Sequence, residues 1–131
     1  MRGEEYLSKP RQFTSVYNQG SSWTLKLISM KVLPNNLTYS RYGFSISKRV
    51  GNAVTRNKIK RRFRECLRMM LLKPGWDIIF IARPVLADVK YAELRMAVEN
   101  LLARADLLEG NSKDSVSLGK SKALDNQRYV T

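Results

Sequence analysis

The sequence of 131 residues contains no histidine and one cysteine. Without histidine the chain cannot form Ser-His-Asp or Cys-His catalytic groups, imidazole metal ligands or an imidazole acid–base catalyst. A single cysteine excludes an intramolecular disulfide framework, and with no histidine beside it argues against a zinc site. Cys66 is most simply a small buried hydrophobic residue. The sequence therefore lacks the groups for imidazole-based catalysis and for histidine metal sites.

Long apolar runs are absent as well. A membrane-spanning helix needs about 18 consecutive apolar residues, and the sequence has no such run. The N-terminal residues MRGEEYLSKPRQF carry acids where a secretory signal needs an apolar segment. We therefore expect a cytoplasmic protein without a membrane partner. With 131 residues and 44% hydrophobic residues, one domain with a modest core is expected.

Acidic residues are scarce in one stretch, which carries most of the net charge. The 33 residues from Arg41 to Lys73 hold 11 Lys and Arg but only one acid, Glu65, and so account for +10 of the chain's net charge of +13. A solvated surface normally mixes both signs. Concentrated positive charge instead indicates a polyanionic partner.

The residues after Gly51 and Asn52 have the period of an amphipathic helix. Its apolar residues fall on one stripe, which we expect to be buried: Ile59, Phe63, Cys66, Leu67, Met70 and Leu71. At about 100° per residue, an adjacent arc of roughly 140° holds Arg56, Asn57, Lys60, Arg61, Arg64 and Arg68. Pro74 and Gly75 should end the helix. The pattern predicts one face against a core and a neighbouring positive face toward another molecule.

The N-terminus of this helix is a candidate phosphate site. Asn52 is a suitable N-cap residue, and Lys48 and Arg49 precede it. Free N–H groups and the helix dipole attract anions at such an end, although a Gly-Asn cap alone is a weak signal.

The N-terminal third of the chain predicts a helix and a strand. Residues 1–10 are expected to be flexible, and a short helix should follow Pro10 and stop at Gly20. From Ser22 to Leu33 the residues favour a strand, but the apolar side changes partway along it. A bulge near residues 27–28 would account for that change.

Two further strands and a second long helix follow. The strand from Ser40 to Ser47 alternates, with only small residues on one face, which leaves room for a backbone or an extended ligand. The continuous apolar run from Trp76 to Ala82 predicts a central strand that is covered on both faces. A structural helix is expected over residues 89–108, and residues 109–131 are expected to form a disordered polar tail. The domain should therefore span residues 11–108.

The sequence RNKIKRRFRE, preceded by RYGFSISKRVGNAV and followed by GWDIIFIARP, resembles the bacterial ribonuclease P protein subunit. The signature of that family is Arg-Asn, two residues, Lys-Arg, two residues and Arg on a helix, and it falls on Arg56, Asn57, Lys60, Arg61 and Arg64. The resemblance covers residues 13–108. It implies an α+β protein, a single two-layer α/β sandwich ordered α-β-β-α-β-α. It also implies a left-handed crossover through the basic helix, which is rare among βαβ units.

The resemblance also implies a function. In this family a large RNA subunit is the catalyst, and it uses bound Mg²⁺ to hydrolyse a phosphodiester in precursor tRNA and so remove the 5′ leader. The protein is an auxiliary subunit that binds the RNA subunit and the single-stranded leader. We therefore expect no catalytic residue, no metal ligand and no small-molecule ligand in this chain.

The residues expected to act divide into two groups. The RNA-subunit-binding group is Arg49, Arg56, Asn57, Lys60, Arg61, Arg64 and Arg68. The leader-binding group is Phe13, Tyr17, Ser45, Ser47 and Lys48. The resemblance assigns Phe13 and Tyr17 to base stacking, whereas their pattern alone is more typical of core residues.

Three alternatives remain open at this point. A small basic ribosomal RNA-binding protein with no role in cleavage would share the size, charge and fold class. A protein-only nuclease would need a carboxylate cluster for metal ions, and Asp77 with Glu65 gives at most a weak pair. A DNA recognition helix is a third alternative, but one long basic helix between strands matches none of the usual docking modules.

Overall fold

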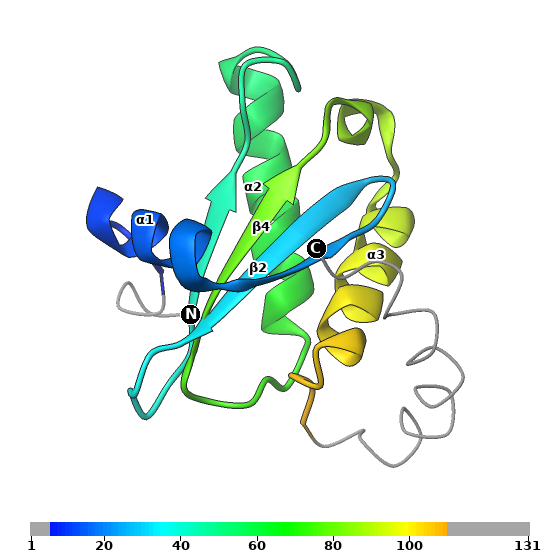
Figure 1. Cartoon of the computed structure of the whole chain (residues 1–131). Coiled ribbons are helices and arrows are strands. Elements are labelled where there is room, and N and C mark those ends of the chain that lie inside the picture. The colour runs from blue at the N-terminus through cyan, green and yellow to red at the C-terminus, as the bar shows by residue number, and fades with distance from the viewer. Residues whose placement is uncertain (1–5, 110–131) are drawn as a thin grey trace.

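The computed structural model describes residues 6–109, which form a four-stranded sheet with helices on both faces (Figure 1). The elements are α1 (Pro10–Gln19), β1 (Ser21–Thr24), β2 (Ile28–Pro34), β3 (Arg41–Ser45), α2 (Ala53–Arg68), β4 (Trp76–Ala82), the 3₁₀ helix η2 (Pro84–Asp88) and α3 (Tyr91–Arg104). The strand order is β1-β2-β4-β3. The predicted α+β sandwich is confirmed, with one strand more than expected before the basic helix.

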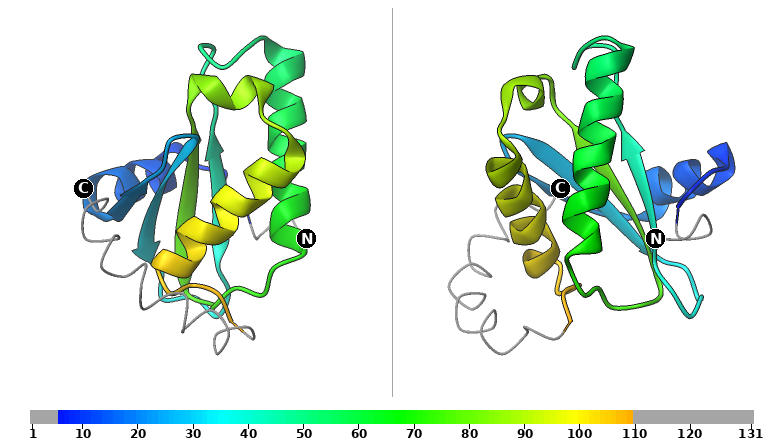
Figure 2. Two further views of the ribbon diagram at one scale, coloured as in Figure 1. Left: turned by 90° about the vertical axis from the view of Figure 1, so that its right-hand side faces the viewer. Right: turned by 180° about the vertical axis from the view of Figure 1, so that it is seen from behind.

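The basic helix α2 connects two parallel neighbours, β3 and β4. In the right-hand view of Figure 2, α2 lies in front of the sheet and β4 lies to the left of β3, with both strands running upward. This geometry is the left-handed crossover that the family resemblance implied. The left-hand view shows α1 on one side of the sheet and α2 and α3 on the other.

The predicted bulge is wrong, because the segment is a hairpin. β1 and β2 pair antiparallel, with Ser21 opposite Val32 and Thr24 opposite Ser29. The N–H of Leu25 donates to the carbonyl of Ile28 at 2.9 Å and closes the turn between the strands. The change of apolar side in the sequence therefore marks a reversal of the chain.

The central strand β4 was predicted with the bounds that the structure shows. Its residues Ile78, Ile79 and Phe80 have no exposed surface, because helices cover both faces. Phe80 belongs to the larger core cluster under α2 and α3, and its ring stacks with Phe63 of α2 at 5.6 Å between centroids. Ile79 points to the other face and packs in a smaller cluster with Val16 of α1.

Several boundaries differ from expectation. The strand expected over residues 40–47 is β3 (Arg41–Ser45), and the helix expected over residues 89–108 is α3 (Tyr91–Arg104). α2 ends at Arg68, and Leu71 beyond it is 69% exposed, so the buried stripe stops before that residue. At the N-terminus, Tyr6 and Leu7 pack into the fold ahead of residue 11, where the domain was expected to begin: Leu7 is 7% exposed and its N–H donates to the carbonyl of Tyr42 at 2.7 Å. The expectations for residues 1–5 and 110–131 fall outside the described part of the chain.

The position of α1 depends on a close backbone approach at Gly20. A Cβ atom there would lie 2.5 Å from the carbonyl oxygen of Val16 and 2.7 Å from that of Val32. The N–H of Gly20 caps α1 by donating to the same Val16 oxygen at 2.8 Å. Glycine therefore lets the chain turn directly from α1 into the hairpin.

None of the helices within residues 6–109 combines the length and the hydropathy that crossing a bilayer would require.

Candidate nucleic-acid interface

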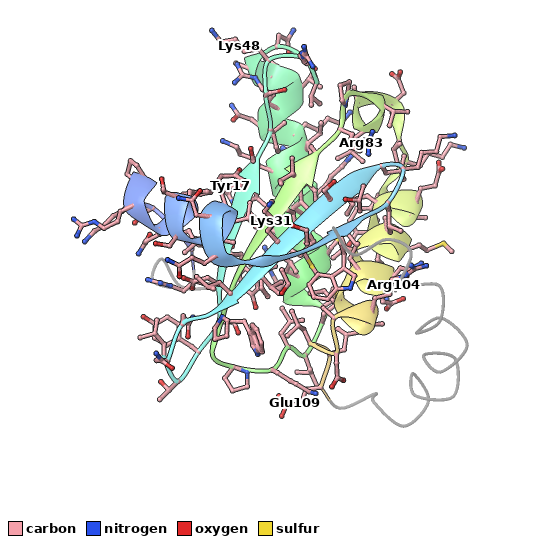
Figure 3. The ribbon with its side chains drawn as sticks, viewed as in Figure 1. Tyr17, Lys31, Lys48, Arg83, Arg104 and Glu109 are labelled. Carbon is pink, nitrogen blue, oxygen red and sulfur yellow. The ribbon has the colours of Figure 1, made fainter. Side chains whose placement is uncertain are left out.

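The N-terminus of α2 is capped as the sequence predicted. The side-chain oxygen of Asn52 accepts the N–H of Thr55 at 2.9 Å. Lys48 and Arg49 are exposed in the loop before the cap, and Lys48 lies at the end of the molecule where α2 begins (Figure 3). Cations thus flank a helix end that already favours anions.

The two sides of α2 have different environments. The Arg62 side chain donates to the carbonyl of Val89 at 3.1 Å, so one side of the helix is joined to the segment before α3. The predicted RNA-binding cations project on the other side of the buried stripe. The guanidinium carbon of Arg64 lies 5.4 Å from the centroid of the Tyr6 ring there. The helix therefore keeps a cationic side that α3 does not cover.

Most side chains of that surface are accessible, and none of them has an acidic partner within residues 6–109. Asn57, Arg61, Arg64 and Arg68 are exposed, whereas Arg56 and Lys60 are half-buried. In the described part of the chain, the ion pairs within 4.0 Å are Arg41–Asp77 and Lys73–Asp106, and neither includes a residue of this surface.

The Arg56 side chain has a buried nitrogen that needs a hydrogen-bond acceptor. Its Nε atom is buried and has no hydrogen-bond acceptor among the described residues. A buried polar atom normally finds a partner, so an acceptor from another molecule would satisfy it. Phosphate oxygens suit a guanidinium because its planar fork can bind two of them at once.

On the opposite face of the sheet, Phe13 packs against β3. A Cβ atom at Gly43 would lie 2.7 Å and 2.9 Å from two ring carbons of Phe13. The space that the small-residue face of β3 leaves is thus occupied at Gly43 by a side chain of α1. Phe13 is half-buried, so it is partly a core residue.

The other predicted leader-binding residues lie on α1 and at or beyond the end of β3. Tyr17 is 37% exposed on α1, and its carbonyl accepts a long hydrogen bond of 3.5 Å from Lys31 of β2 (Figure 3). Ser45 is half-buried at the end of β3, and Ser47 and Lys48 are exposed beyond it. The structure thus places α1 aromatics on one face of the sheet and the cations of α2 on the other.

Asp77 has a structural partner that sequence reasoning missed. Its carboxylate accepts two hydrogen bonds from Arg41, at 2.7 and 2.8 Å, and one from Asn35 at 2.9 Å. The hydrogen bonds from Arg41 to Asp77 raise the pKa of the guanidinium. These donors engage both oxygens of Asp77, so its carboxylate already has hydrogen-bond partners within the fold. No local pattern could indicate a contact between β3 and β4.

The described residues also offer no metal-binding cluster, since no three His, Cys, Asp or Glu side chains among them gather in one place. Cys66 is buried, and burial raises the pKa of its thiol. It therefore behaves as the small hydrophobic residue that the sequence indicated.

Comparisons with known proteins agree with this geometry. A family model described as ribonuclease P matches residues 1–106. The ribonuclease P protein component of Dehalococcoides mccartyi strain CBDB1 is 47% identical over 108 residues, which cover 82% of this chain and 90% of that protein. The corresponding protein of Roseiflexus castenholzii is 40% identical, covering 79% of this chain and 88% of its own length.

Solved structures show the same fold. The RNase P protein of Staphylococcus aureus has a TM-score of 0.73 and 30% identity, covering 80% of this chain and 98% of that one. The RNase P protein of Thermotoga maritima has a TM-score of 0.71 and 31% identity, covering 81% of this chain and 99% of that one.

These matches favour a tRNA-processing subunit over a ribosomal RNA-binding protein without a role in cleavage. They also agree with a chain that carries phosphate-seeking cations but has no histidine. The chain belongs to the ribonuclease P protein family and is the auxiliary protein subunit of an endoribonuclease that works with an RNA subunit.

Proposed function

We propose that the exposed side of α2 binds the RNA subunit, while α1 and β3 bind the single-stranded 5′ leader of precursor tRNA in the cytoplasm. The observation that carries this proposal is the set of α2 cations with no acidic partner among the described residues. Such a set repels itself until phosphates neutralise it. Arg49, exposed in the loop before the helix, would extend the same surface.

Asn57 gives the surface an uncharged side chain that can recognise RNA by hydrogen bonding. Its amide is exposed between the cations, and it can donate to and accept from a base edge or a 2′-OH. Arginine side chains fix register on phosphates through two-point contacts, whereas Lys60 acts more as a point charge.

The proposal divides the chemistry between the subunits. Mg²⁺ would supply the charge stabilisation and the activated water for phosphodiester hydrolysis. The described residues do not fit a Mg²⁺ site, because Asp77 is engaged by Arg41 and Asn35 and no acidic cluster exists among them. We therefore place the metal on the RNA subunit and the substrate. The protein would hold the leader and the RNA in register.

For the leader, the proposal relies on stacking and on backbone contacts. Aromatic side chains stack on bases with about 1–3 kcal/mol per base. Tyr17 is accessible for such stacking, and Phe13 presents the part of its ring that β3 does not cover. Ser45, Ser47 and Lys48 would contact the leader backbone past the end of β3.

The α2 surface is tested by the salt dependence of binding to the RNA subunit. Arg61→Ala should weaken binding and reduce the slope of log K against log salt by about 0.7–0.9 for each phosphate that the variant no longer neutralises. Lys58→Ala is the matched control, because Lys58 is exposed on the same helix but lies outside the predicted arc. Equal effects of both variants would mean that the helix binds through general charge and not through this side.

The leader site is tested with two substrates. Tyr17→Ala should lower affinity for precursor tRNA and leave affinity for mature tRNA unchanged, because only the precursor carries a leader. Tyr39→Ala is the control, since Tyr39 is equally exposed but lies in the loop before β3. The proposal fails if Tyr17→Ala weakens both substrates alike while the melting temperature is unchanged.

A further inference from the structure

The segment before α1 pairs with the free edge of the sheet. Tyr6 forms a parallel bridge with Tyr42, and the N–H of Leu7 donates to the carbonyl of Tyr42 at 2.7 Å. Since β3 is the edge strand, this short segment continues the sheet outward by one position. Neighbouring residues in extended chain point to opposite faces. Leu7 accordingly packs with Val16 under α1, and Tyr6 packs against the cluster under α2.

The Tyr6 ring is held by other aromatic rings. It meets Tyr42 edge to face, with 6.4 Å between centroids and 63° between planes. It also contacts Phe44 at 6.3 Å, and Phe44 stacks on Phe63 of α2 at 5.2 Å. The ring is therefore fixed relative to the helix that carries the cations.

Arg64 lies over this fixed ring. Its guanidinium carbon is 5.4 Å from the ring centroid, within the range of a cation–π contact. Arg64 is exposed and falls in the middle of the predicted arc. A cation–π contact depends on the charge of the guanidinium, and arginine has five N–H donors, so donors remain available for phosphate. The contact therefore restricts a long side chain that can still bind RNA.

We infer that Tyr6 is a positioning residue, which orients Arg64 for binding to the phosphate backbone of the RNA subunit. The inference rests on the proposed role of α2 and adds a residue from a distant part of the sequence. Ordering Arg64 before binding reduces the entropy lost on binding. Removal of the ring should therefore weaken RNA binding without any loss of positive charge.

The experiment is a double-mutant cycle on the full chain, with binding to the RNA subunit as the readout. Tyr6→Leu should weaken binding by about two- to fivefold, the range of an exposed cation–π contact. Tyr6→Phe keeps the ring and should bind as the parent does. In an Arg64→Ala background, Tyr6→Leu should cause no further loss. In an Arg61→Ala background, its loss should remain in full.

Thermal melts of every variant separate positioning from folding. If Tyr6→Leu melts much lower, Tyr6→Met supplies a second ring-free variant that keeps apolar contact with Phe44. The inference is overturned if the losses from Tyr6→Leu and Arg64→Ala are independent, or if Tyr6→Phe binds as weakly as Tyr6→Leu. If Arg64→Ala and Arg61→Ala both bind RNA as the parent does, the proposed α2 site itself fails.

Discussion

Replacing Gly43 by alanine should disturb the leader site by displacing one side chain of α1. The new Cβ would lie 2.7 Å and 2.9 Å from ring carbons of Phe13 and 3.1 Å from Leu7 Cδ1, whereas ordinary contact begins at 3.4 Å. Ile79, which pairs with Gly43 from β4, is fully buried in the cluster that Phe13 and Leu7 pack in, so β3 cannot move away from the Phe13 ring. The ring of Phe13 must therefore shift outward.

The expected cost follows from this overpacking. Extra atoms in a packed site cost about 1–3 kcal/mol, and a half-buried ring places this substitution toward the lower end. For a domain of about 100 residues, each kcal/mol lowers Tm by about 4–8 °C. If Phe13 stacks on a leader base, its displacement should also lower affinity for precursor tRNA by up to about tenfold.

The assay compares Tm and leader affinity in three variants. Gly43→Ala should lose both, and Phe13→Leu should lose leader affinity with a smaller change in Tm. In the double variant the smaller side chain should recover Tm but not leader affinity. The reasoning is refuted if Phe13→Leu does not rescue Tm, or if the double variant binds precursor tRNA as the parent does.

Two further predictions concern stability. Asp77→Asn should cost near the lower end of about 3–5 kcal/mol in chemical denaturation, because it leaves the Arg41 side chain, only 19% exposed, without its carboxylate. Asp106→Asn should cost less than about 1 kcal/mol, because the side chains of the Lys73–Asp106 pair are 37% and 85% exposed. Equal costs would contradict the account. Burial raises the pKa of the Cys66 thiol above its ordinary 9.0. The contribution of the neutral buried thiol to stability is therefore complete below pH 9.0, and it is lost as pH rises through the higher pKa of the folded state. Unfolding free energy should therefore decline above pH 9.0, and less steeply in Cys66→Ala; equal slopes would show that another group causes the decline.

Local signals predicted the elements whose ends are set locally. Pro10 and Gly20 bound α1 as expected. The apolar run of β4 was enough to predict that strand, because a strand buried on both faces has no alternation of apolar and polar residues. The hairpin was missed because its turn, from Leu25 to Leu27, contains none of the residues that mark turns. The hairpin moves the apolar residues of the sequence from one side of the strand to the other, and a bulge would produce the same change.

The candidate site also has features that local signals predicted and features that they could not predict. Helical period alone placed the α2 cations beside the buried stripe, and Asn52 marked the cap. It could not show that the helix stops at Arg68, since nothing in the Met-Met-Leu-Leu run that follows disfavours a helix. Contacts that join distant parts of the chain, such as Tyr6 with Arg64, leave no local pattern.

The most direct test of the central claim is precursor tRNA cleavage at low Mg²⁺ by the RNA subunit with and without this chain. The protein alone should cleave nothing, and its addition should increase cleavage by the RNA subunit. An Arg56→Ala, Arg61→Ala and Arg64→Ala triple variant that folds normally should lose that increase. Cleavage by RNA-free protein, or full support of cleavage by the triple variant, would contradict the account.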